Sequence, residues 1–269
     1  MVERVADGSP RYDTRYQRGA WGAALLASAA CWVLTVQGAR EMAGGMPMPG
    51  GWTMSMGWMV MPGQSVAAAA VMFVGMWTAM MVAMMLPSVL PVVLLYRGLV
   101  RSRRARAIPV VPETALLAGY FAVWTLFGLV TFGIGLWFAD LTMREESVSQ
   151  AVPLLSGAAL IAAGVYQITP LKRLCLHHCR SPLSFFMTSW RDGWLGTFRL
   201  GVHHGAYCTA CCWALMLIQV VVGVMNLWMM VAIAGVIAIE KSWRHGERFA
   251  VAAGLAAIAA GAARVGLLI

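Results

Sequence analysis

Apolar segments close to the length that crosses a bilayer recur along most of this 269-residue chain. A transmembrane helix needs about 20 mostly apolar residues, and only helices or closed barrels satisfy their backbone groups in lipid. The composition agrees, because 60% of the residues are hydrophobic and 12% are charged. We therefore expect an all-α integral membrane protein, a bundle of about seven (six to seven) transmembrane helices. The expected spans are residues 19–38, 68–96, 113–139, 152–170, 205–223, 225–240 and 249–268.

The first apolar segment is expected to remain in the protein as a membrane helix. It follows a long polar segment, and no small-residue cleavage pattern comes after it. The chain then consists of a basic N-terminal segment, residues 1–18, and a single transmembrane domain, residues 19–269.

The basic residues fall in alternate loops between these spans. If the N-terminus is cytoplasmic, all of the 20 Lys and Arg residues except Arg40, Arg144 and Arg264 lie on the inner side. This asymmetry follows the positive-inside rule. The net charge of +9 then reports topology and contact with anionic lipid, and no nucleic-acid partner is expected.

Residues 39–65 are expected to form an outer loop, because Gly and Pro recur there too often for a regular helix. The loop is rich in methionine, and the next span continues with methionines at four-residue spacing until Pro87 and Pro91 disturb the helix near its inner end. Thioethers bind Cu(I) without deprotonation, so they suit an oxidising compartment. The alternative is an interfacial loop followed by a packing stripe. The candidate metal entry and pathway residues are Met46, Met48, Met54, Met56, Met59, Met61, Met72, Met76, Met80 and Met84.

The inner loop expected at residues 171–207, with the start of the span after it, holds most of the cysteines and histidines. The segments CLHHCR and HHGAYCTACC each place cysteines and a histidine three or four residues apart, which is one face of a helix. Two such half-sites can converge on tetrahedral zinc or low-coordinate Cu(I). Gln167, Gln219 and Glu240 are polar groups beside them. The candidate metal ligands are Cys175, His178, Cys179, His203, His204, Cys208, Cys211 and Cys212.

The segments MMLPSVLP, YQITPLKRLCLHHCR and GAYCTACCWALM resemble a bacterial family of predicted metal-binding integral membrane proteins. It is a domain of unknown function with CLxxC and CxxCCW motifs, and the resemblance covers roughly residues 70–240. It implies a multi-span protein of the bacterial inner (cytoplasmic) membrane with a metal site. The implied site residues are Cys175, Cys179, Cys208, Cys211 and Cys212.

The leading hypothesis is a Cu(I)-handling membrane protein, either a passive transporter or a factor for metal transfer and insertion. One alternative is a membrane thiol or copper-dependent oxidoreductase that uses the Cys208/Cys211 pair. Another is a structural subunit of a larger membrane complex, stabilised by zinc. ATP-driven pumping is not expected, because the chain has no phosphate-binding loop. Small residues at Ala253, Ala257 and Gly261 favour either helix packing within the chain or a homo-oligomer contact.

Overall fold

The structure is a computed structural model, and it describes residues 14–42, 44–104, 111–181, 186 and 189–268. Most of the predicted basic segment 1–18 and parts of the predicted inner loop therefore lie outside the described residues. The described elements are the helices α1 (Thr14–Glu41), α2 (Val66–Arg104), α3 (Glu113–Arg144), α4 (Glu146–Ile168), α5 (Pro170–Arg180), α7 (Gly193–Gly223), α8 (Leu227–Ser242) and α9 (Gly246–Gly266), the strands β1 (Gly45–Met48) and β2 (Trp52–Ser55), and the short 3-10 helix η1 (Met56–Trp58).

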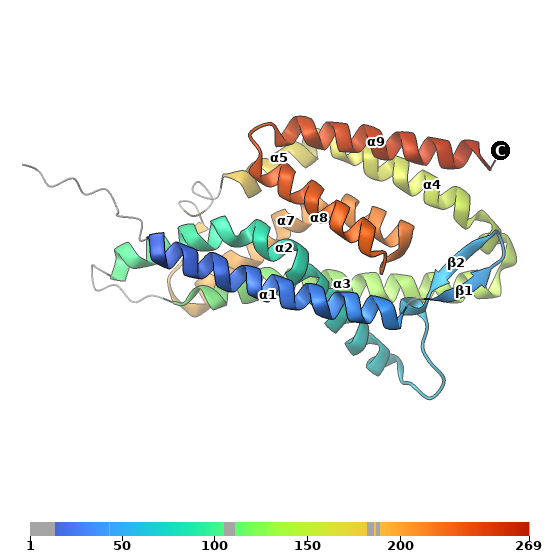
Figure 1. The fold of residues 1–269 in the computed structure, drawn as a ribbon, viewed down its shortest axis with the longest axis horizontal. Coiled ribbons are helices and arrows are strands. Elements are labelled where there is room, and N and C mark those ends of the chain that lie inside the picture. Colours follow the sequence, from blue (N-terminus) through green and yellow to red (C-terminus); the bar gives the residue numbers. More distant parts are fainter. Residues whose placement is uncertain (1–13, 43, 105–110, 182–185, 187–188, 269) are drawn as a thin grey trace, which may run out of the picture.

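The all-α membrane bundle predicted from the sequence is confirmed. Within the described residues, six helices are long and apolar enough to cross a membrane: α1, α2, α3, α4, α7 and α9. The span predicted at 225–240 is α8, whose 16 residues are fewer than the about 20 that a full crossing requires. The C-terminal ends of α2, α5 and α8 gather at the left-hand end of the bundle in Figure 1, and the β-hairpin and the C-terminus lie at the other end.

Helix α7 begins 12 residues before the predicted span at 205. Its first turns pack closely on α3, because both helices carry glycine at the contact. A Cβ added at Gly201 would lie 2.0 Å from the carbonyl oxygen of Leu116, and one added at Gly119 would lie 2.1 Å from that of Phe198. This contact keeps residues 193–204 helical, so much of the predicted inner loop belongs to α5 and α7.

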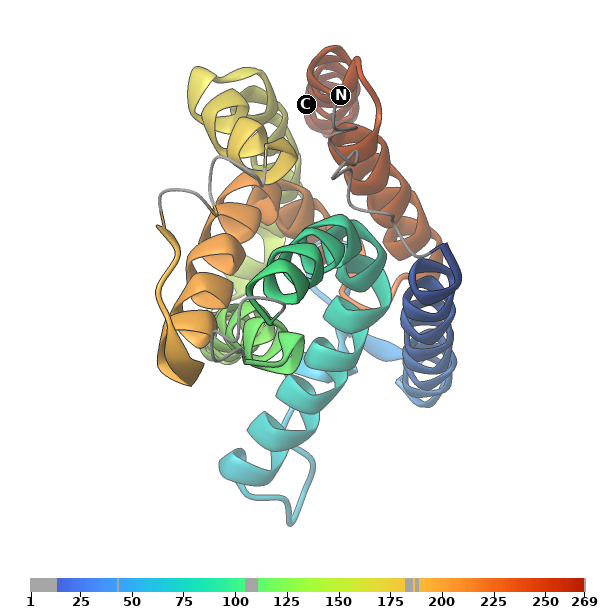
Figure 2. The ribbon, with the colours of Figure 1, turned by 90° about the vertical axis from the view of Figure 1, so that its left-hand side faces the viewer.

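Helix α2 runs through both of its prolines, and its direction changes along its length (Figure 2). Proline at 87 has no N–H to donate to the carbonyl of Ala83, which a regular helix would require. The hydroxyl of Ser28 in α1 donates to that carbonyl at 2.8 Å instead. The predicted disturbance of the second span is thus a bend that a neighbouring helix stabilises.

The methionine-rich outer loop contains a β-hairpin. Strands β1 and β2 are antiparallel, and Met46 pairs with Met54. The hairpin is held at a carbonyl that a proline leaves free. Pro153 has no N–H to donate to the carbonyl of Ser149 within α4. The indole of Trp52 donates to this carbonyl at 3.0 Å. The hairpin is therefore fastened to the start of α4.

Helices α4 and α9 lie side by side and contact each other through small residues (Figure 1). A Cβ added at Gly164 would lie 2.5 Å from the carbonyl oxygen of Gly254, and one added at Gly261 would lie 2.6 Å from that of Gly157. Of the two uses expected for the small residues of the last span, the structure shows packing within the chain.

Candidate metal centre

Four of the predicted ligands meet as free thiols between α5 and α7. The Cys179 sulfur lies 3.7 Å from the Cys211 sulfur, which lies 3.3 Å from that of Cys212. Cys208, one turn earlier in α7, is completely buried like its neighbours. We call Cys179, Cys208, Cys211 and Cys212 the thiol cluster, and none of them forms a disulfide.

A break in the chain directs α5 onto α7. Thr169 has the extended backbone that a residue before proline prefers, and it ends α4. Its hydroxyl then caps α5 by accepting from the N–H of Lys172 at 3.3 Å, and Pro170 occupies the first turn of the new helix, where no N–H is needed. The new direction brings Cys179 against Cys211.

The cysteines predicted to share a helical face are buried on both helices, whereas His178, predicted on the same face of α5, is half-buried. On α7, His204 and Met216 continue the buried face of Cys208, Cys211 and Cys212, and on α5 Cys175 is buried one turn before Cys179. The His204 ring stacks on Tyr120 at a centroid distance of 5.7 Å. Cys175 and His204 therefore border the thiol cluster.

Two other candidate ligands lie in a different place. His178 stacks on Tyr207 at a centroid distance of 4.4 Å, and the ring of His203 lies 5.1 Å from the same tyrosine. His203 is exposed and His178 is half-buried. These two histidines form an outer aromatic stack with Tyr207, apart from the buried sulfurs.

Two lysines border the thiol cluster, Lys172 and Lys241, although the pattern of basic residues predicts both in inner loops. The ammonium of Lys241 donates to the Cys208 sulfur at 3.0 Å, and the hydroxyl of Tyr120 lies 3.0 Å from the same sulfur. Lys172 is completely buried, because α5 packs against α7 and α8. The sequence signal for their burial was their position: Lys172 closely follows the apolar helix α4, and Lys241 lies in the last turn of the apolar helix α8.

Lys172 links the three helices around the cluster. Its ammonium donates to the carbonyl of Cys211 in α7 at 2.5 Å and forms an ion pair with Glu240 in α8 at 2.7 Å. The amide of Gln167 donates to the other carboxylate oxygen of Glu240 at 3.0 Å. Two of the three polar groups noted beside the cysteines, Gln167 and Glu240, therefore belong to one buried network. The third, Gln219, donates instead to the carbonyl of Gly223 at the C-terminal end of α7, at 3.0 Å.

Burial and the neighbouring side chains shift the pKa values of three groups on α5. Hydrogen bonding with Cys208 and burial together raise the pKa of the Cys179 thiol, and burial raises that of Cys175. Burial alone would lower the pKa of Lys172, but the neighbouring Cys212 and Glu240 outweigh it and hold this pKa above its ordinary value. Lys172 is therefore charged at neutral pH.

The sulfur positions can be compared with those around a bound metal. A metal about 2.3 Å from each sulfur of a tetrahedral site holds the sulfurs roughly 3.8 Å apart. The Cys179–Cys211 separation is close to this value, whereas Cys211 and Cys212 are closer together. Among the described residues, no three His, Cys, Asp or Glu side chains are arranged as a metal site. The cluster supplies the donor chemistry for a soft metal, although its sulfurs are not arranged as a metal site in this structure.

The candidate methionines are dispersed. Met48 and Met54 are buried in the hairpin, while Met46, Met56 and Met59 are half-buried and Met61 is exposed. On α2, Met80 and Met84 are buried, Met76 packs on Gly38 of α1, and Met72 is 67% exposed on the outside. The stripe therefore turns from the surface into the core along α2.

Comparisons with known proteins place the chain in a family. Residues 74–264 match the family described as PpoB2: Copper chaperone. No curated protein and no solved structure matches the chain. The matched region is most of the chain and includes the thiol cluster with Lys172 and Lys241, which supports the metal-binding family expected from the cysteine motifs. The chain belongs to the PpoB2 copper chaperone family.

Proposed function

We propose that the protein binds Cu(I) as cargo at the thiol cluster and transfers it to an acceptor. The observation that carries this proposal is the meeting of four buried thiols from two helices, with the ammonium of Lys241 on the Cys208 sulfur. Thiolates are the ligands that soft Cu(I) prefers.

The surroundings suit a monovalent ion. Two thiolates bound to Cu(I) carry one net negative charge, and Lys241 lies where it can compensate that charge. Lys172 is already neutralised by Glu240. The remaining thiols allow one ligand to replace another, so the ion is held and still released, as transfer requires.

The methionines support transfer over conduction. A conducting path needs consecutive sites through the bundle, but Met72 faces outward and Met76 packs on α1. The hairpin methionines, next to the start of α4, lie at the other end of the bundle, so we propose them only as a separate Cu(I)-binding site and not as the entry to a path toward the thiol cluster.

Metal analysis of the purified protein tests the proposal. The wild-type protein, loaded with Cu(I) under reducing conditions, should retain about one copper ion per chain, bound by thiolates. The triple variant Cys208→Ser, Cys211→Ser, Cys212→Ser should lose it, and Cys179→Ser should bind it more weakly. Cys31→Ser is the matched control, because this free cysteine lies in α1, outside the thiol cluster.

The same analysis separates the alternatives. Retention of copper by the triple variant would refute the assignment of the site. Zinc at full occupancy with no copper would favour the structural subunit. Thiol trapping in cells tests the oxidoreductase alternative. A transfer site requires thiols that remain reduced, so a Cys208/Cys211 pair that cycles between dithiol and disulfide would favour the oxidoreductase.

We also propose that the end of the bundle where the C-termini of α2, α5 and α8 gather faces the cytoplasm, in accordance with the distribution of the basic residues. Ser242 lies at that end and Glu145 at the other, and both are exposed. Single cysteines at these positions, probed with a membrane-impermeant reagent, should label from opposite sides, with Glu145→Cys reacting in intact cells. Labelling of both from one side would contradict the orientation.

A further inference from the structure

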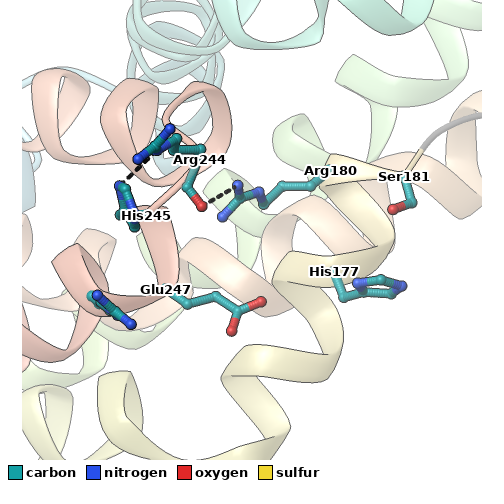
Figure 3. Close-up of a pocket in the computed structure, with 7 residues that line it drawn as sticks. His177, Arg180, Ser181, Arg244, His245 and Glu247 are labelled. Atoms are coloured by element: carbon teal, nitrogen blue, oxygen red, sulfur yellow. Dashed lines mark hydrogen bonds between the residues drawn. The ribbon is translucent and has the colours of Figure 1, made fainter.

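A polar pocket lies beside the thiol cluster, between the C-terminus of α5 and the connection from α8 to α9 (Figure 3). Its volume is about 510 Å³. Three arginines line it, against one carboxylate among the described lining residues. The lining residues are His177, Arg180, Ser181, Arg244, His245, Glu247 and Arg248.

The pocket is held together by Arg180. Its guanidinium donates to the carbonyl of Trp243 at 2.7 Å and to that of Arg244 at 3.3 Å. Gly246 permits the close approach, because a Cβ there would lie 2.9 Å from the Arg180 Nη1 and 2.1 Å from the carbonyl oxygen of Glu240. The connection is thus fixed around a guanidinium group, and its geometry does not depend on a ligand.

The other two arginines, Arg244 and Arg248, are both exposed. The Nε of Arg244 donates to the Nδ1 of His245 at 3.4 Å, and its terminal nitrogens and the guanidinium of Arg248 can donate to a ligand. The start of α9 contributes the positive end of a helix dipole, which Glu247 in the first turn partly offsets. Guanidinium groups bind phosphate through paired, charge-assisted hydrogen bonds.

Apolar side chains continue from the pocket along the same surface. Leu174 shares a face of α5 with His177 and Ser181 by helical spacing, and it is 57% exposed. Trp243 is 50% exposed, and its ring lies 5.4 Å from that of the lining residue His245. A phosphate bound among the arginines would therefore have exposed apolar side chains nearby for the acyl chains of a lipid.

We propose that this pocket binds the headgroup phosphate of an anionic phospholipid. Basic pockets between membrane helices are suited to such headgroups, and each nearby arginine adds to the attraction. The inference does not depend on the copper proposal, because none of the lining residues is a thiol.

Native mass spectrometry of the protein in neutral detergent tests it, with dioleoylphosphatidylglycerol, dioleoylphosphatidylcholine and inorganic phosphate as separate probes. Arg244→Gln/Arg248→Gln should weaken phosphatidylglycerol binding at least about tenfold, since two charged hydrogen-bond donors are lost. The matched control Arg191→Gln/Arg199→Gln removes the same charge from exposed positions in and just before α7, and it should bind as the wild type does. Arg180 is left intact because it holds the connection.

The outcomes are distinct. Preference for phosphatidylglycerol over phosphatidylcholine that depends on Arg244 and Arg248 supports the proposal. Equal binding by the pocket variant and the control variant would overturn it. If inorganic phosphate binds with the same dependence and excludes the lipid, the ligand is a soluble phosphate and the lipid assignment is wrong.

Discussion

Replacing Lys172 by methionine should destabilise the fold by about 3–5 kcal/mol, the usual cost of removing one partner from a buried ion pair. The Lys172 and Glu240 side chains are 0% and 1% exposed and 2.7 Å apart. Methionine retains most of the apolar stem, so the loss comes from the carboxylate left in the core and from the bond to the Cys211 carbonyl. In a chain of this size the melting temperature should fall on the order of 10 °C.

Thermal unfolding in detergent measures this change, and Arg173→Met is the matched control. Arg173 is the next residue of α5, but its side chain is exposed, so its loss should cost less than about 0.5 kcal/mol. The double variant Lys172→Met/Glu240→Gln removes both charges and should recover part of the stability, because no unpaired charge remains in the core. Equal melting of Lys172→Met and Arg173→Met would refute the reasoning, as would a double variant that costs the sum of the single changes.

Two further predictions concern packing and the thiol cluster. Gly164→Ala should destabilise the protein by about 1–3 kcal/mol, measured by the same thermal unfolding, because the added Cβ would lie 2.5 Å from the Gly254 carbonyl oxygen. The control Gly133→Ala meets nothing within 4 Å, and similar melting of the two variants would contradict the proposed contact. Tyr120→Phe removes the hydroxyl 3.0 Å from the Cys208 sulfur and should weaken Cu(I) binding roughly tenfold, as losses of groups around metal ligands do. Competition with a chromogenic Cu(I) chelator measures this, and unchanged affinity would exclude a role for the tyrosine.

The class of fold and the faces of single helices follow from the amino-acid sequence alone. Apolar segments of bilayer length predict helices, because lipid offers the backbone no other partners. Helical spacing predicted that His204 and the cysteines of α7 lie on one face, and all of them are buried. Pro87 and Pro91 predicted where α2 is disturbed, since proline lacks the N–H that a helix needs.

Which of these helical faces meet depends on how distant helices pack. Spacing made Cys175, His178 and Cys179 equal candidates, yet the direction of α5 after Thr169 brings Cys179 to Cys211 and leaves His178 on the outer tyrosine. The charge pattern predicts Lys172 in an inner loop, but the structure buries it in an ion pair with Glu240, which lies 68 residues away in the chain. Periodicity specifies how side chains are arranged around one helix axis, whereas the rotation and contact of separate helices depend on packing between distant segments. The thiol cluster and its charges are products of that packing.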